Sequence, residues 1–224
     1  MPLRQELVNA RRAFLARLSE DKAAVIGVAE TLLRSSGMLT SARRTGDRIP
    51  PFVLEGVAGE VDFGRLLARG PAVVTFIQGG WSPFCRLELT AWQRMMPYAR
   101  ALRIPVLAVS PQTVAENLRT RTKLNLSFDL LHDAGNSVAA AWGLSYSLPP
   151  MLRHIYRQLG VDLERINGDR NWSLPVPATY VLDSGGRVAA SFADLDVSHR
   201  MEPIDALMAA SSLLTEAADE LVSA

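Results

Sequence analysis

The sequence is poor in cysteine, since only one, Cys85, occurs among its 224 residues. A lone cysteine cannot form a disulfide within the chain, nor can it build the cysteine-pair zinc sites of small structural domains. The histidines, His132, His154 and His199, stand singly and lack the spacing of metal ligands. We therefore expect no metal site and no cofactor.

The sequence also lacks a charge excess and a long apolar run. It has 24 basic and 23 acidic residues, whereas a general nucleic-acid binder would show a basic excess. A membrane span needs about 20 consecutive apolar residues, and the strand-like run 72–77 is far shorter. The N-terminus has no continuous apolar stretch that could serve as a signal peptide. We expect a cytoplasmic protein, with no nucleic-acid or membrane partner, whose thiol stays reduced.

The first 36 residues carry the apolar spacing of helices. Residues three and four positions apart fall on one helix face, as do Leu3, Leu7, Ala10, Phe14 and Leu18. Ser19 predicts the start of a second helix, which ends near Gly37. We interpret residues 1–45 as a helical extension that packs on the main domain or, alternatively, serves as a dimerisation arm. Residues 46–224 form the main domain in this interpretation.

In the main domain, predicted strands and helices alternate. Strands are expected at 52–54, 72–77, 106–109, 128–131, 180–182 and 188–192. Helices are expected at 63–68, 83–102, 114–122, 137–142, 151–159 and 202–221. The Asp-Ser-Gly-Gly cluster at 183–186 predicts a hairpin between the last two strands. The order predicts an α/β fold with a mixed sheet and helices on both faces, consistent with a thioredoxin-like sandwich.

The most informative segment runs from Gly79 to Cys85, between a buried strand and a long helix. Ser82 suits the N-cap of that helix, and Pro83 suits its first position. Cys85 then falls in the first turn, where free N–H groups and the helix dipole favour a thiolate. Glu88, about one turn later, is expected to be a charge on the helix surface.

Five ordered motifs carry a resemblance to a known family. They are Gly46–Leu54 (GDRIPPFVL), Gly79–Leu89 (GGWSPFCRLEL), Val109–Pro111 (VSP), Leu174–Asp183 (LPVPATYVLD) and the stretch Asp194–Pro203. Together they resemble the alkyl hydroperoxide reductase and thiol-specific antioxidant (AhpC/TSA) family, specifically its peroxiredoxin-like branch within the thioredoxin superfamily. The resemblance covers about residues 46–210.

The resemblance implies an antioxidant peroxidase. Cys85 would be its peroxidatic cysteine, and Ser82 would hydrogen-bond the thiolate and the peroxide. A hydroperoxide would be the substrate, an external thiol such as glutathione or thioredoxin would be the reductant, and a homodimer would be the assembly. The Val176–Pro177 peptide bond would be cis, with the proline facing the cysteine. The substrate pocket would be lined by Trp81, Pro83, Pro177 and Thr179, while Trp81 and Trp172 could equally belong to the core.

Three positions depart from the expected pattern. Ser82 stands where the branch usually has a first cysteine, so Cys85 has no partner for a dithiol cycle. Pro177 stands where typical peroxiredoxins have an arginine, and Gln78 stands where they have a proline. Arg153, Arg170 and Arg200 are candidates to replace the arginine. Two alternatives to a one-cysteine peroxidase stay open: a monothiol thiol–disulfide oxidoreductase, and a non-catalytic binding or regulatory protein with this fold.

Overall fold

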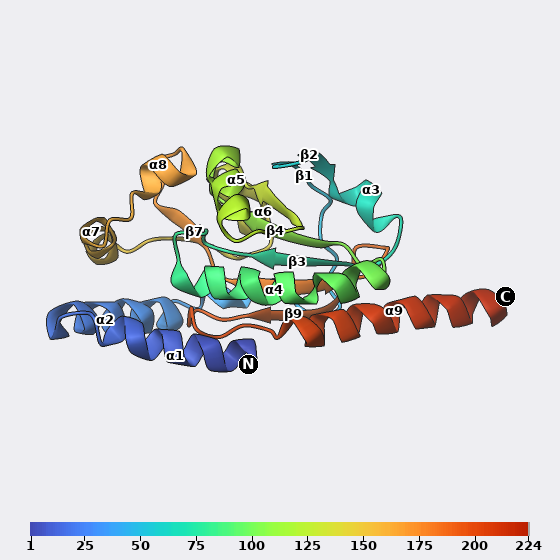
Figure 1. Cartoon of the computed structure of the whole chain (residues 1–224), viewed down its shortest axis with the longest axis horizontal. Helices are drawn as coiled ribbons and strands as arrows, with labels where there is room; N and C mark the ends of the chain where they lie inside the picture. Colours follow the sequence, from blue (N-terminus) through green and yellow to red (C-terminus); the bar gives the residue numbers. More distant parts are fainter. Residues whose placement is uncertain (224) are drawn as a thin grey trace.

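A computed structural model describes residues 1–223, with side chains through Thr215 (Figure 1). Its centre is a seven-stranded mixed sheet in the order β2-β1-β5-β4-β3-β8-β9. These strands are β1 (Val53–Gly56), β2 (Gly59–Asp62), β3 (Ala72–Phe76), β4 (Val106–Ser110), β5 (Asp129–His132), β8 (Ala178–Leu182) and β9 (Val188–Ala193). A separate pair joins β6 (Ser145–Ser147) to β7 (Ser173–Pro175). The mixed sheet confirms the predicted fold class.

Helices flank the sheet and precede it in the chain. They are α1 (Leu3–Leu15), α2 (Glu20–Ser35), α3 (Phe63–Leu67), α4 (Pro83–Ala101), α5 (Val114–Lys123), α6 (Ser137–Ala141), α7 (Pro150–Gln158), α8 (Leu163–Asn167) and α9 (Pro203–Ser223). None of these described helices is long and apolar enough to cross a membrane. Every helix and strand predicted from the sequence is present, whereas β2, β6, β7 and α8 were not predicted.

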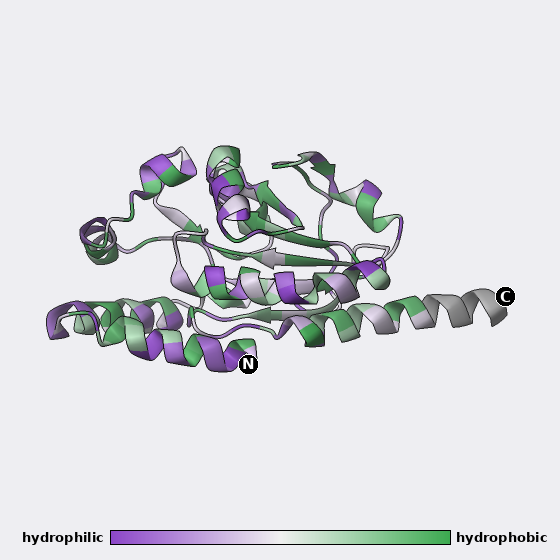
Figure 2. Ribbon diagram, in the orientation of Figure 1, coloured by the Kyte–Doolittle hydropathy of each residue, from purple (hydrophilic) through white to green (hydrophobic). Residues whose placement is uncertain are grey.

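Alternating residues of the buried strands supply two cores, one on each face of the sheet. Val73 and Ile77 point to the face that α4 and α9 cover, and Val74 and Phe76 point to the face that α3 and α6 cover. This arrangement follows from the period-two side-chain pattern of a strand that is buried on both faces. Figure 2 shows the resulting concentration of apolar residues along the central strands.

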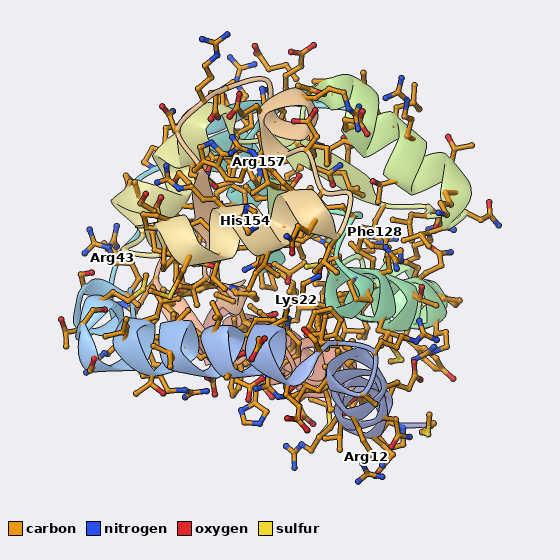
Figure 3. All side chains as sticks on the ribbon, turned by 90° about the vertical axis from the view of Figure 1, so that its left-hand side faces the viewer. Arg12, Lys22, Arg43, Phe128, His154 and Arg157 are labelled. Atoms are coloured by element: carbon orange, nitrogen blue, oxygen red, sulfur yellow. The ribbon has the colours of Figure 1, made fainter. Side chains whose placement is uncertain are left out.

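The N-terminal helices form a hairpin against the main body, at the left of Figure 1. The apolar face of α1 packs on α4, where Leu3 and Leu7 meet Phe84 and Ala91. Helix α2 lies alongside α7, as Figure 3 shows from the side. The predicted packing of this extension on the main domain is therefore confirmed.

Candidate functional site

A short loop joins β3 to α4, and Cys85 lies just after it, in α4. Gly79 has φ +137°, a backbone conformation that favours glycine. A Cβ atom on Gly80 would lie 2.3 Å from Thr120 Oγ1, so a larger residue does not fit without movement. The Arg86 guanidinium fastens the loop from the helix, since its Nη1 donates to the Gly80 carbonyl at 3.0 Å and to the Trp81 carbonyl at 2.8 Å.

The predicted start of α4 is confirmed. Ser82 is the N-cap, and its Oγ accepts a hydrogen bond from the backbone N–H of Cys85 at 3.4 Å. Pro83 occupies the first helical position, where its missing N–H costs nothing. Cys85 therefore lies in the first turn, at the positive end of a long helix.

The side chain of Cys85 is completely enclosed, with 0% exposure. It belongs to the core between the sheet and α4, together with Val73, Ile77, Leu89 and Trp92. A reagent in bulk solvent therefore cannot touch the sulfur in this conformation. Access requires movement of side chains around the first turn of α4.

Glu88 corrects a prediction, because it is a buried charge and not a surface charge. One of its carboxylate oxygens lies 2.6 Å from Arg200 Nε, and the other accepts from the Thr75 hydroxyl at 2.7 Å. The side chains of Arg200 and Glu88 are 1% and 0% exposed. Local sequence does not reveal the pairing, because Arg200 lies far along the chain, in the loop before α9. Its guanidinium supplies the charge that makes burial of Glu88 tolerable.

Thr179 joins the same polar cluster. Its Oγ1 lies 3.2 Å from Thr75 Oγ1 across the pair of strands β3 and β8. Both threonines are buried, and neither lines the cavity described below. Thr179, which was predicted to line the substrate pocket, therefore lies within the sheet and not on the wall of this cavity.

Pro177 is buried between β7 and β8, one residue before Ala178, which pairs with Phe76. This register places Pro177 at the level of Ile77, which shares a core with Cys85. The expected cis peptide bond is wrong, because none of the peptide bonds in residues 1–223 is cis. The Val176–Pro177 bond is trans, which is the form that an X-Pro bond favours by about 0.5–1 kcal/mol.

The three candidate arginines differ in their surroundings. Arg200 is buried against Glu88, as described above. Arg153 donates to the Leu148 carbonyl at 2.9 Å and lies 5.6 Å from the ring of Trp172. Among the described interactions Arg170 has no partner near the site. Arg200 is therefore the candidate that the structure links, through Glu88, to the helix that carries Cys85.

A cavity of about 340 Å³ lies next to the first turn of α4. Trp81, Ser82, Pro83 and Phe84 form one part of its wall, which places three of the predicted site residues together. The N-terminal hairpin, the loop around Val197, and α7 with the residues that follow it form most of the rest, and Gln78 and Tyr146 complete it. Cys85 is the next residue in the sequence after Phe84, but it does not line the cavity. The motif predicted Trp81 and Pro83 on a pocket wall, but not the hairpin and α7 residues opposite them, because those segments are distant in the chain.

Two tyrosines reach the cavity beside Ser82. Burial, helped by the neighbouring Tyr156 and Cys85, raises the pKa of Tyr146 well above its usual value. Burial also raises the pKa of Tyr156, again with a contribution from Cys85. Both phenols therefore remain neutral at physiological pH and can act as hydrogen-bond donors. The sequence offered no periodic or motif signal for either tyrosine.

One family model matches the chain. The model of the AhpC/TSA family matches residues 45–191, well over half of the chain. A search of curated proteins gave no match.

Solved structures with a similar fold are peroxiredoxins. Peroxidoxin BcpB from Mycobacterium tuberculosis is 20% identical, with a TM-score of 0.59 over 76% of this chain and 97% of that one. A mutant of peroxiredoxin 6 from Arenicola marina is 13% identical, with a TM-score of 0.61 over 79% of this chain and 76% of that one. Peroxiredoxin Q from Xanthomonas campestris is 16% identical, with a TM-score of 0.53 over 73% and 90%. At these identities the likeness is one of fold.

Proposed function

Since the chain belongs to the AhpC/TSA family, we propose that it is a thiol-dependent peroxidase with Cys85 as its one redox-active residue. The observation that carries this proposal is the position of Cys85 in the first turn of α4, N-capped by Ser82. The helix N-terminus stabilises a thiolate, which is the reactive form of cysteine. No second cysteine exists in the chain to share the reaction.

The proposed reaction has an oxidative and a reductive half. The Cys85 thiolate attacks the terminal oxygen of a hydroperoxide, a sulfur–oxygen bond forms, and the oxygen–oxygen bond breaks. The leaving alkoxide takes a proton and departs as an alcohol, or as water from hydrogen peroxide. Cys85 is thereby oxidised by two electrons to a sulfenic acid, while the peroxide is reduced.

The reductive half needs two external thiols of the glutathione or thioredoxin class. The first condenses with the sulfenic acid, releases water and leaves a mixed disulfide on Cys85. The second attacks that disulfide, frees the Cys85 thiol and departs as the oxidised reductant. An external reductant is required in this scheme because Ser82 stands where a resolving cysteine would otherwise lie.

Ser82 and the polar cluster behind the site have supporting roles in this proposal. Ser82 lines the cavity, and its hydroxyl, which accepts from Cys85 N–H, has a proton that it can donate to a bound peroxide. Glu88 and Arg200 act as positioning residues, because they fix the second turn of α4 against the sheet. Turnover also requires the wall at Trp81 and Phe84 to open, since Cys85 is enclosed.

The test is hydroperoxide consumption with a thiol reductant by the wild-type chain and by Cys85→Ser. We expect turnover that depends on both the reductant and Cys85. Glutathione, a thioredoxin system and dithiothreitol should each be assayed, because the natural reductant is not implied by the site. Equal background rates for the two chains would refute the proposal.

The complete burial of Cys85 favours a second candidate, a binding or regulatory protein that retains the fold without turnover. In that case the cavity would bind its ligand while Cys85 served only as a small core residue. A folded Cys85→Ala chain that keeps every cellular function of the wild type would select this candidate. A loss of function on Cys85→Ser, with the fold intact, would reject it.

A further inference from the structure

A second cavity lies at the end of α4 that is remote from Cys85. Its volume is about 470 Å³, within the range of small-molecule sites, which is roughly 300–1,000 Å³. Its wall comes from the last turns of α4, from α3 and the segment after it, and from the segments that lead into β4 and β5, at the right of Figure 1. Arg100 on this wall lies about 22 Å from Cys85 along the helix axis. The cavity is therefore separate from the proposed redox site.

Most of the lining of this second cavity is apolar and buried. The buried lining residues are Pro71, Met96, Ala99, Ile104, Val106 and Phe128. Three arginines apart, no described lining side chain has a nitrogen or an oxygen atom. Such a surface gains free energy when an apolar ligand replaces water, and it has nothing to offer the polar groups of a hydrophilic ligand.

The charge on the wall is entirely positive. Arg69, Arg100 and Arg103 line the cavity, and none of its described lining residues is acidic. All three arginines are exposed, so they stand where the cavity opens to solvent. None of them forms an ion pair within the described part of the chain. Because the whole chain has 24 basic and 23 acidic residues, this is a local excess of positive charge, and it attracts an anion.

The end of the helix does not by itself account for these arginines. Arg100, in the last turn of α4, complements the helix dipole, and its Nη2 donates to the Ser127 carbonyl at 3.1 Å, which leaves its other N–H groups free. Arg103 follows the helix with φ +56°, a left-handed conformation in which glycine is less strained. Arg69 comes from the segment after α3 and has no part in ending α4.

We propose that this second cavity binds an anionic amphiphile, an aliphatic chain that ends in a carboxylate. The chain packs on the buried apolar lining, and the carboxylate accepts hydrogen bonds from the arginines at the opening. The planar guanidinium group suits a carboxylate because it can donate two parallel N–H bonds to the two oxygens. The ligand is not a substrate of Cys85, and its binding does not depend on the proposed peroxidase function.

The first test is calorimetric titration of the full chain with hexanoate, octanoate, decanoate and decanol at neutral pH. We expect the dissociation constant to fall by about threefold to fourfold for each methylene group added. Decanoate should bind at least about tenfold more tightly than decanol, because its head is charged, and Cys85→Ser should bind it as the wild type does. No measurable binding, binding that is independent of chain length, or equal binding of decanol would overturn the proposal.

Arg103→Gly separates binding from stability. Glycine relieves the left-handed backbone, so the variant should melt at or above the wild-type temperature, yet it should bind decanoate about fivefold to tenfold more weakly. Asn125→Gly is the matched control, because Asn125 has φ +50° just after α5 and is not on the cavity wall. It should leave binding unchanged. Equal affinities of the two variants for decanoate would contradict a ligand-binding role of Arg103.

Further variants locate the ligand on the molecule. Arg69→Met should weaken decanoate binding about fivefold, whereas Arg12→Met, which removes an exposed charge on α1, should not. Ile26→Phe obstructs the cavity beside Ser82 and should leave binding unchanged. Loss of binding in Ile26→Phe but not in Arg69→Met would place the ligand in that other cavity and overturn the proposal. Arginine-dependent binding to phosphatidylglycerol vesicles, without binding of decanoate, would overturn it in favour of a membrane surface.

Discussion

Arg200 Nε lies 2.6 Å from a carboxylate oxygen of Glu88, and both side chains are enclosed almost completely. The pair ties the loop before α9 to the helix that carries Cys85. Thr75 completes the contacts of Glu88 from β3. Strand β3 and the loop before α9 are thereby both fixed to the second turn of α4.

The first prediction concerns this pair. Arg200→Met should lower the free energy of unfolding by about 3–5 kcal/mol, because Glu88 would be left as an uncompensated buried charge. Arg65→Met, which breaks an exposed ion pair with Asp62, should change it by less than about 1 kcal/mol. Urea denaturation measures both. The double variant Glu88→Leu/Arg200→Met should recover part of the loss, and an equal loss in Arg200→Met and in the double variant would argue against this account.

The second prediction concerns the loop before α4. Gly80→Ala should destabilise the fold by about 1–3 kcal/mol and slow any reaction at Cys85, since its Cβ would overlap Thr120. Gly27→Ala is the matched control, because Gly27 lies in α2 with nothing within 4 Å of the added Cβ. It should stabilise the chain by up to about 1 kcal/mol. A neutral Gly80→Ala variant would show that the loop shifts freely.

The third prediction concerns access to Cys85. Arg11 joins the two helices of the hairpin through Glu30 and anchors the hairpin to the main domain through Asp196. Its neighbour Arg12 is exposed and forms no ion pair among the described residues. Arg11→Met should therefore raise the rate of Cys85 alkylation by iodoacetamide about fivefold, as expected if opening becomes about 1 kcal/mol easier. Arg12→Met should leave the rate unchanged. Identical rates in both variants would mean that the hairpin does not control access.

The fourth prediction concerns acid. Burial alone would raise the pKa of Asp196, but hydrogen bonds from Ser198 and the charge of Arg11 outweigh it, and the net pKa is lowered. A lowered folded-state pKa adds stability above the unfolded value of about 3.9, and this stability is lost as pH falls through the folded value. Asp196→Asn should therefore flatten the fall in unfolding free energy below about pH 4. Asp205→Asn, an exposed control on α9, should follow the wild type.

Local patterns in the sequence predicted most of the fold. The strands β3 and β4 are apolar runs, the cap at Ser82 is a local motif, and the hairpin of β8 and β9 has a turn signal at Asp183–Gly186. Short elements escaped prediction because they lack such patterns. Strand β2 is polar, and β6 owes its form to non-local pairing with β7, where Tyr146 faces Leu174.

The candidate site was predictable only in part, for the same reason. Trp81, Ser82 and Pro83 were found together on the cavity wall because they are consecutive in a recognisable motif. Glu88 was misassigned because its partner Arg200 is remote in the sequence, and Tyr146 was missed because its relation to Gln78 is purely spatial. The local motif around Cys85 predicted its place at the start of a helix. The side chains that surround it could not be predicted, because the tertiary fold brings them together from distant parts of the sequence.

The central claim is that Cys85 is the one redox-active residue and depends on an external thiol. Intact-mass spectrometry after one equivalent of hydroperoxide tests it most directly. We predict addition of one oxygen atom per chain at Cys85, absent in Cys85→Ser. In separate samples, dimedone should trap the sulfenic acid, and excess glutathione should return the chain to its original mass. An unchanged wild-type mass, or the same oxygen addition in Cys85→Ser, would contradict the claim.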